Sequence, residues 1–384
     1  MSFLGYPRPD GSVGTRNYVA VIPTVICAAA TARQISENVK GSVPFLHHQG
    51  CALTPNDLAL VNRTLKNLAL NPNIAAVVLV SLGCDPVDID GIAEGIAEAG
   101  KPVEKLVIQD VGGTVATVEK GTRIARQMVS DATRITREEF DDSHLMFGAE
   151  CGGSDTTSGL GSNPAIGAAF DTVIQKGGSA VFSETTEFVG AEHLLANRAV
   201  TPEVGKTITD MVLRYEKIFL EKGVDMRGMN PTKGNIEGGL TSIEEKSLGA
   251  ISKGGTMPIQ EMYEYGERPT KKGLTITDGP GFDAPSLTTL AAAGANVMFF
   301  STGRGTPLGS PFVPVIKVTA NGATYEKMND NIDFYVDLAR KGNMGEVGAE
   351  LYAHALEVAS GRQTKAETLN QDLYNGIFII GPLA

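Results

Sequence analysis

Residues 73–100 have the sequence NIAAVVLVSLGCDPVDIDGIAEGIAEAG, which contains the clearest fold signal in the chain. Ile74–Leu82 is an unbroken apolar run of strand length, and such runs are typical of strands buried on both faces of a parallel sheet. In Val87–Ala99 the apolar residues recur at helical spacing. A strand followed directly by a helix is the repeating unit of α/β folds.

The same strand–helix order recurs before and after this unit. In the first third of the chain we expect strands at Tyr18–Ile26, Val43–Leu46 and Leu106–Gln109, and helices at 28–39, 56–70 and 114–132. Further on we expect strands at 145–147, 180–183, 274–277, 296–301 and 314–318, and helices at 164–175, 201–221, 285–293 and 346–359. The sequence therefore predicts an α/β protein with mostly parallel sheets, built from βα units in two α/β lobes, with its site at the C-terminal ends of strands.

The length of 384 residues favours two or three domains. The acidic stretch Arg137–Ser143 separates the two series of βα units, so we predict an N-terminal α/β domain over 1–140 and a C-terminal α/β domain over 141–384. Within the second domain, residues 222–255 are Gly-rich and polar with little periodicity. We interpret this segment as a long functional loop.

Composition excludes several classes of function. With 33 Lys and Arg against 44 Asp and Glu, the net charge of −11 argues against nucleic acid or an anionic membrane as the main partner. No apolar run reaches the roughly 20 residues of a transmembrane helix, and the N-terminus lacks the apolar segment of a secretory signal. Four cysteines without a CxxC pair do not form a disulfide framework. We expect a cytoplasmic protein that acts on a small molecule.

All four cysteines follow predicted strands. Cys27, Cys51 and Cys84 lie after strands of the first lobe, with His47 shortly before Cys51, and Cys151 lies after a strand of the second lobe. Ligands of parallel sheets bind at the carboxyl ends of the strands, and thiolate with imidazole suits iron or zinc rather than magnesium. We predict that these five side chains meet in a metal site. The alternative is that the cysteines are buried structural residues, as free cysteines commonly are.

Three further segments carry candidate functional groups. Ser183–His193 combines carboxylates with an imidazole, which is typical either of an acid/base or metal cluster or of a solvated helix start. Glu244–Lys246 is either functional or an exposed charge run. In Thr302–Thr306, glycines flank an arginine, so the backbone can approach an anion while the guanidinium binds a carboxylate. A tight turn with a surface arginine is the alternative for this last segment.

Several longer motifs span nearly the whole chain: GYPRPDGSVGTRNY (5–18), PTVIC (23–27), HHQGC (47–51), SLGCD (81–85), CGGSDTTSG (151–159), SETTEFVGAEH (183–193), KGNIEGGLTSIEEKSLG (233–249), DGPGFD (278–283) and TGRG (302–305). Together they resemble the altronate/galactarate dehydratase family in its large-subunit form, to which a sulfolactate sulfo-lyase branch is related. Asp85, Ile26 and Gly279 depart from the residues common in the family, which bears on the identity of the substrate.

The resemblance implies a lyase that dehydrates a sugar acid to a 2-keto-3-deoxy acid with Fe²⁺, or alternatively Mn²⁺, as cofactor. It also implies a small accessory subunit, and we expect a homo-oligomer. Such a reaction needs a base, a clamp for the carboxylate, and an acid or metal for the departing hydroxyl. We assign catalysis to Lys246, His193 and Glu187, substrate binding to Arg304, Gly303, Thr302, Asp155, Asn235 and Arg16, and iron to His47, Cys51, Cys84, Cys151 and Cys27.

Two other functions compete with dehydration. The first is a sulfo-lyase that releases sulfite from a sulfonated hydroxy acid. The second is a non-catalytic sensor of metal or redox state that uses the four thiols. A sensor needs no carboxylate clamp, so in that case Arg304 and Lys246 would be dispensable and far from the thiols.

Overall fold

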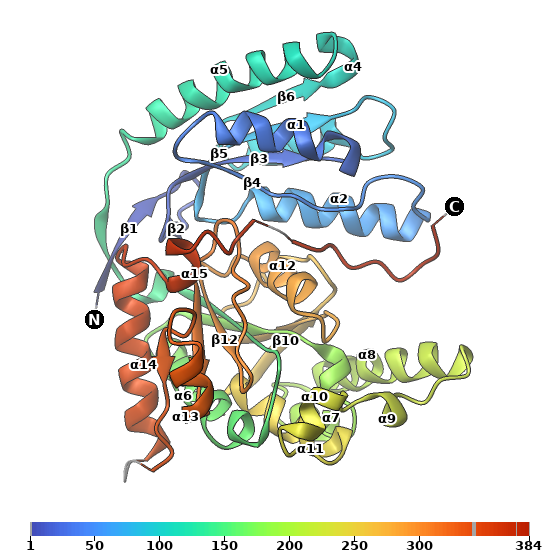
Figure 1. Cartoon of the computed structure of the whole chain (residues 1–384), viewed down its shortest axis with the longest axis vertical. Coiled ribbons are helices and arrows are strands. Elements are labelled where there is room, and N and C mark those ends of the chain that lie inside the picture. The colour runs from blue at the N-terminus through green and yellow to red at the C-terminus, as the bar shows by residue number, and fades with distance from the viewer. Residues whose placement is uncertain (1, 340–342, 374, 384) are drawn as a thin grey trace.

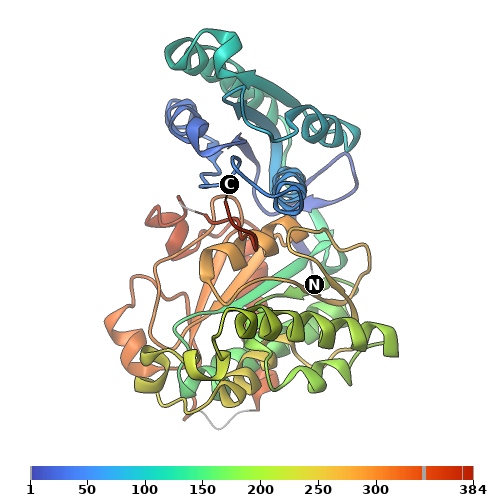
Figure 2. The same ribbon diagram turned by 90° about the vertical axis from the view of Figure 1, so that its right-hand side faces the viewer.

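The structure, a computed structural model, describes residues 2–339, 343–373 and 375–383. It has two α/β lobes, and the C-terminal segment runs between them (Figures 1 and 2). Each lobe is built on a parallel sheet, which confirms the predicted fold class. Among the described helices, none is both long and apolar enough to cross a membrane.

The N-terminal lobe contains a parallel four-stranded sheet in the order β4-β3-β5-β6. Its central strand β5 is buried along its whole length, because helices cover both faces of its uninterrupted apolar sequence. The elements of this lobe are β3 (Tyr18–Pro23), α1 (Ile26–Glu37), β4 (Ser42–Pro44), α2 (Pro55–Ala69), β5 (Ile74–Ser81), α3 (Ile89–Glu98), β6 (Val103–Val107), α4 (Ile108–Val111) and α5 (Thr114–Ala132).

A small antiparallel sheet connects the start of the chain to the segment between the lobes. β1 (Ser2–Pro7) pairs with β2 (Val13–Gly14) on one side and with β7 (Glu138–Asp141) on the other. The acidic stretch that we predicted as a boundary is therefore partly a strand, and the division at residue 140 falls inside it.

The C-terminal lobe contains a parallel seven-stranded sheet in the order β10-β11-β9-β8-β12-β13-β14. α6 and α14 pack on one face, whereas α12 packs on the other and contacts α2 of the N-terminal lobe. The strands are β8 (Met146–Cys151), β9 (Ser179–Phe182), β10 (Ile259–Tyr263), β11 (Leu274–Thr277), β12 (Val297–Ser301), β13 (Val315–Thr319) and β14 (Phe334–Tyr335). The helices outside 222–255 are α6 (Asn163–Gln175), α7 (Glu192–Ala196), α8 (Pro202–Glu221), α12 (Asp283–Ala293), α13 (Gly322–Lys327), α14 (Met344–Ala359) and α15 (Lys365–Thr368).

The segment 222–255 is not the long loop that we predicted. It folds into three short helices, α9 (Met226–Met229), α10 (Lys233–Glu237) and α11 (Ile243–Ile251). Capping side chains stabilise the starts of two of these helices. Asp225 accepts a backbone hydrogen bond at the start of α9, and Ser242 accepts one at the start of α11. Helices this short show no clear hydrophobic period in the sequence.

Candidate active site

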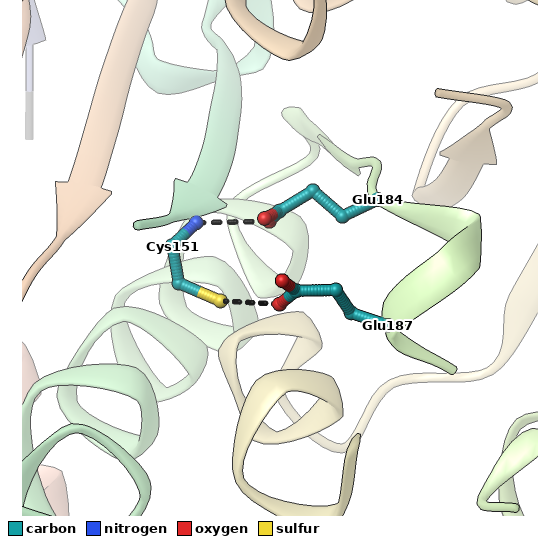
Figure 3. Close-up of side chains that lie close together, drawn as sticks. All are labelled: Cys151, Glu184 and Glu187. Carbon is teal, nitrogen blue, oxygen red and sulfur yellow. Dashed lines mark hydrogen bonds between the residues drawn. The ribbon is translucent and has the colours of Figure 1, made fainter. Parts of the chain in front are cut away.

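A buried group of three side chains lies where two neighbouring strands of the C-terminal sheet end. Cys151 is the last residue of β8, and Glu184 and Glu187 lie in the turn after β9. Figure 3 shows that both carboxylates point to Cys151: its backbone N–H donates to Glu184 at 2.8 Å, and its thiol donates to Glu187 at 3.6 Å. Within the described part of the chain, this is the one group of three metal-ligating side chains whose ligand atoms lie within 4.8 Å of one another.

Two lysines complete this group. Lys246 of α11 forms an ion pair with Glu187, with Nζ 2.7 Å from the carboxylate. Lys253, in the 3-10 turn after α11, pairs with Glu184 at 2.7 Å and donates to the Cys151 thiol at 3.2 Å. Both lysines are buried, and Lys253 is inaccessible to solvent. Two carboxylates and two ammonium groups therefore balance one another inside the protein, as buried charges require.

The backbone at Glu184 is held in an uncommon conformation. Its φ of +80° lies in the left-handed region, which non-glycine residues rarely adopt. The next residue, Thr185, anchors the turn to the end of β11, because its N–H donates to Gly279 O and its hydroxyl donates to Asp278. Such strain is typical of functional sites, where the surrounding structure fixes a side chain in position.

The ionisable groups of the site differ in the direction and cause of their pKa shifts. Burial raises the pKa of Glu184 to about 7, although the ammonium of Lys253 opposes this shift. Burial, together with the charge of Glu184, also raises the pKa of the Cys151 thiol, so the thiol stays protonated. Burial lowers the pKa of Lys246, but the contact with Glu187 outweighs burial and the net pKa is raised. Glu184 is therefore a group that changes its protonation near neutral pH, whereas Lys246 stays charged.

A cavity of about 250 Å³ opens beside Lys246, and Asp155, Leu160 and Leu248 also line it. Lys246 connects this cavity to the buried group, because its ammonium contacts Glu187 and donates to Asn230 at 3.1 Å. A small molecule in the cavity would thus meet a fixed positive charge.

The segment Thr302–Gly305 lies directly beside Cys151, since β12 pairs with β8 and Ser301 is opposite Cys151. The N–H groups of Gly303 and Arg304 both donate to Gly153 O, which ties the two strand-end loops together. A Cβ atom at Gly303 would lie 2.2 Å from the Asp155 carboxyl carbon, so only glycine fits there. The Arg304 guanidinium is about half exposed and lies 3.4 Å from Glu237. An exposed pair of this kind is weak and can exchange partners.

Three residues that we predicted as substrate contacts use their side chains in hydrogen bonds within the loops: Asp155, Asn235 and Thr302. Asp155 accepts from Ser158 N and from Asn321 Nδ2. Asn235 donates to Ser154 O and accepts from Thr232 N, while the Thr302 hydroxyl accepts from Gly305 N. All three are buried. Their bonds fix the loops that surround the cavity.

Two other predicted residues lie outside this group. His193 is exposed on α7 and makes none of the contacts described above. Arg16 lies between the lobes, where its guanidinium pairs with Glu367 at 2.6 Å and donates to three backbone carbonyl groups. These bonds use the donors that a substrate carboxylate would need.

The structure does not gather the five predicted iron ligands at one point. Cys151 ends a strand of the C-terminal sheet, whereas Cys27, Cys51 and Cys84 are exposed at strand ends of the N-terminal sheet. His47 is buried and engaged at both ring nitrogens: Nε2 is 2.7 Å from Pro23 O, and Nδ1 accepts from Gln49 N at 3.2 Å. Burial lowers the pKa of His47 to about 4. The strands that precede these residues belong to two different sheets, and among the described residues the five predicted ligands do not form a group whose ligand atoms lie within 4.8 Å of one another.

Three buried ionisable groups were not predicted as individual site residues. Glu184 lies inside the SETTE motif, but nothing local distinguishes it from Glu187. Lys253 follows the last motif of the segment 222–255, and its role depends on the way its own 3-10 turn packs against β8 and β9. Glu150 precedes Cys151 and is inaccessible; burial, with Asp283 and Glu184 nearby, raises its pKa.

Comparison with known proteins gives two family models and several relatives. The model described as D-galactarate/Altronate dehydratase, C-terminal, matches residues 142–379, and the model described as D-galactarate dehydratase/Altronate hydrolase, second domain, matches residues 5–133. The chain is 40% identical to the (2R)-sulfolactate sulfo-lyase subunit beta of Chromohalobacter salexigens, over 96% of this chain and 95% of that one. It is 34% identical to the altronate dehydratase of Bacillus subtilis, over 95% of this chain and 75% of that one. It is 35% identical to the galactarate dehydratase (L-threo-forming) of Escherichia coli, over 99% of this chain and 77% of that one.

Proposed function

The chain belongs to the D-galactarate/altronate dehydratase family, and on this premise we propose that it is a hydro-lyase that dehydrates a sugar acid to a 2-keto-3-deoxy acid. The observation that supports this proposal best is the buried group of Glu184, Glu187, Lys246 and Lys253 beside a cavity of about 250 Å³. It combines a carboxylate that titrates near neutral pH with a fixed positive charge.

The base takes the proton on C2, next to the carboxylate, and can return it to the C3 hydroxyl, which then leaves as water. The enol that results tautomerises to the 2-keto acid. Glu184 is our proposed base, because a base whose pKa lies near the working pH is most effective. Lys246, which we predicted as a base, is better suited to hold the negative charge that grows on the substrate carboxylate, since Glu187 keeps it protonated. Arg304, in the loop after β12 beside Cys151, is our proposed second member of this carboxylate clamp.

The family resemblance implies iron as cofactor, as Fe²⁺ or alternatively Mn²⁺. Bound at the site, such an ion would supply a Lewis acid for the departing hydroxyl. The ligand atoms of Cys151, Glu184 and Glu187 have a suitable spacing, but each carboxylate already contacts an ammonium group. At 4 Å, two like charges repel by about 4 kcal/mol at an effective dielectric constant of about 20, so a divalent ion fits this lysine-paired group poorly. We therefore derive no step through a metal there.

The second candidate is a sulfo-lyase, which is favoured by the 40% identity to a sulfolactate sulfo-lyase subunit of similar length. Removal of sulfite from a sulfonated hydroxy acid needs the same base and carboxylate clamp, and only the leaving group differs.

That sulfo-lyase relative is called subunit beta, and the altronate and galactarate dehydratases are longer than this chain. We therefore propose that a small accessory subunit joins this chain. We also propose, as expected from the sequence, that the enzyme is homo-oligomeric and cytoplasmic.

A thiol sensor without catalytic activity is disfavoured. A thiol sensor does not need a lysine near its thiols. Here Lys246 forms an ion pair with Glu187, and Glu187 contacts the Cys151 thiol. The enzymes among its relatives point the same way.

A substrate screen tests the proposal. The purified chain, supplied anaerobically with ferrous iron, would be incubated with altronate, galactarate and sulfolactate, and 2-keto acid and sulfite would be measured separately. We expect 2-keto acid from a sugar acid without sulfite, and loss of this activity in a folded Lys246→Met variant. Sulfite release would instead establish the sulfo-lyase, and failure with every hydroxy acid, also in the presence of the small subunit, would contradict both candidates.

A further inference from the structure

A cavity of about 330 Å³ lies at the amino ends of the strands of the C-terminal sheet. Met146 begins β8, Ser179 begins β9 and Asn296 precedes β12, and all three residues line the cavity. Pro72, between α2 and β5 of the N-terminal lobe, also lines it. This inter-lobe cavity is therefore at the edge of the sheet opposite to the candidate active site, and its volume is that of a small-molecule pocket.

The charged side chains in the wall of the inter-lobe cavity are cationic. Arg268, Lys271 and Lys272 line it, together with the imidazole of His144. Of the residues that the structure describes, no Asp or Glu lines the cavity, although the chain has 44 Asp and Glu against 33 Lys and Arg. In a protein with this excess of negative charge, a wall with cations alone favours an anion locally.

The Arg268 guanidinium uses few of its donors within the protein. It has five N–H groups, and among the described residues it makes one hydrogen bond, to Leu70 O at 3.3 Å. The carboxylate of Asp10 lies 3.7 Å from it, which is beyond hydrogen-bond distance, and accepts from the N–H and hydroxyl of Ser12 instead. The Arg268 side chain is 31% exposed, so a largely buried charge is left with weak partners.

Lys272 and Ser179 supply further donors to the cavity. The Lys272 ammonium contacts a backbone carbonyl, Ser143 O at 3.2 Å, rather than a carboxylate. The Ser179 hydroxyl accepts a hydrogen bond from a backbone N–H at 3.3 Å, so its own proton is available to a ligand. Lys271 is less available, because it pairs with Glu261 at 2.9 Å. Arg268, Lys272 and Ser179 are therefore the groups best able to bind an anion.

Two buried cations next to Arg268 add to the positive potential. Arg8 and Lys101 are both buried. Burial lowers the pKa of Lys101, and the nearby charges of Arg8 and Arg268 lower it further, so the three cations repel one another. The Asp10 carboxylate opposes these charges only in part. An anion in the inter-lobe cavity would reduce this repulsion.

We propose that the inter-lobe cavity binds a small molecule through a phosphoryl group. Such a group carries about 1.5 to 2 negative charges at pH 7 and three strong acceptor oxygens, whereas a carboxylate carries one charge and two oxygens. The planar guanidinium of Arg268 can bind two of these oxygens, and Lys272 supplies a point charge for the third. The site is separate from the proposed dehydration, whose base and clamp lie at the opposite edge of the sheet.

Isothermal titration calorimetry of the full chain in a chloride buffer tests this site without any hydroxy acid. Inorganic phosphate and glycerol 3-phosphate are the probes, and glycerol is the uncharged control. We expect one probe bound per chain, and at least about tenfold weaker binding by Lys272→Met and by Arg268→Lys. Lys120→Met, which removes an exposed lysine of α5, is the matched control and should bind as the wild type does. Tighter binding of glycerol 3-phosphate assigns the site to a phosphate ester, and equal or tighter binding of inorganic phosphate assigns it to the free ion.

Thermal unfolding gives a second measurement and shows whether each variant is folded. A ligand that binds the folded chain raises its Tm, so the probe that binds more tightly should raise the Tm of the wild type and of Lys120→Met more than that of Lys272→Met. Failure of both probes to bind, equal binding of glycerol, or equal affinity of the two lysine variants would each overturn the proposal. These readouts are independent of turnover, so an inactive protein that binds phosphate at this site would contradict the proposed dehydration alone.

Discussion

At the scale of single residues, Glu184 sets the pH range in which the proposed chemistry works. Burial raises its pKa to about 7, so its carboxylate form, which a base requires, predominates only above that pH. We therefore expect kcat/KM to rise with pH and to level off above about 7. A rate profile between pH 5 and 9 checks this. A flat profile over this range, as expected for a base with the ordinary glutamate pKa of about 4.3, would exclude Glu184 as the base.

Substitution of Glu184 gives the matching test. Glu184→Gln keeps the shape of the side chain but removes the base, so we expect kcat to fall by about 10²- to 10⁴-fold. Lys253→Met should instead move the rising limb to higher pH, because the ammonium that favours the carboxylate is lost. Circular dichroism would verify folding, and an active Glu184→Gln enzyme would contradict the assignment.

Arg304 carries the third prediction at this scale. Its planar guanidinium binds both oxygens of a carboxylate, whereas lysine offers a single point charge. Arg304→Lys should keep the fold but lose about 10²-fold in kcat/KM. Glu237→Gln is the control, since it removes only the exposed partner of Arg304. Near-normal kcat/KM in Arg304→Lys would leave Lys246 as the clamp.

The candidate site could be predicted from the sequence only in part, for a physical reason. Glu187 and Lys246 were both predicted, and the structure joins them in an ion pair. Glu184 and Lys253 were not, because their pairing depends on the fold of 222–255 over the ends of β8 and β9, which no local pattern encodes. The roles of buried charges follow from their partners, and those partners come from distant parts of the chain.

At the scale of secondary structure, local patterns identify the elements that carry their own signal. β5, α5 and β11 lie where we predicted them, because an apolar run or a helical period is a property of the segment itself. β7 was not predicted, because its residues are largely exposed and because it pairs with β1, which lies more than a hundred residues earlier in the sequence. The helices of 222–255 were missed because they are short.

The contact between Gly50 and Thr24 gives a prediction for the loops of the N-terminal sheet. Gly50→Ala forces a side chain into a left-handed backbone, φ +112°, and against Thr24 O. Gly112→Ala is the matched control, because Gly112 has φ +102° but no heavy atom within 4 Å of the added Cβ. We expect Gly50→Ala to lower the free energy of unfolding by over about 1 kcal/mol more than the control does. Equal losses in urea unfolding would show that the contact is unimportant.

At the scale of the whole molecule, the lobes are joined by a continuous buried interface. α2 of the N-terminal lobe packs on α12 of the C-terminal lobe within one apolar core. Buried asparagine side chains also form hydrogen bonds between the lobes: Asn71 donates to Ala291 O, and Asn73 donates to Phe312 O. The interface is therefore both apolar and hydrogen-bonded, which favours a fixed arrangement of the lobes.

Substitution of Arg16 tests how much a buried ion pair at this interface contributes to stability. We predicted it as a substrate contact, but it joins the lobes through Glu367, and both side chains are about 7% exposed. Removing one partner of a buried ion pair leaves the other charge unpaired, which costs about 3–5 kcal/mol. Arg16→Met should therefore lower Tm strongly, while KM, measured at a temperature where the variant is folded, stays close to that of the wild type. Arg33→Met, which removes a mostly exposed pair with Glu37, should leave Tm nearly unchanged. A raised KM with an unaltered Tm would instead return Arg16 to the substrate site.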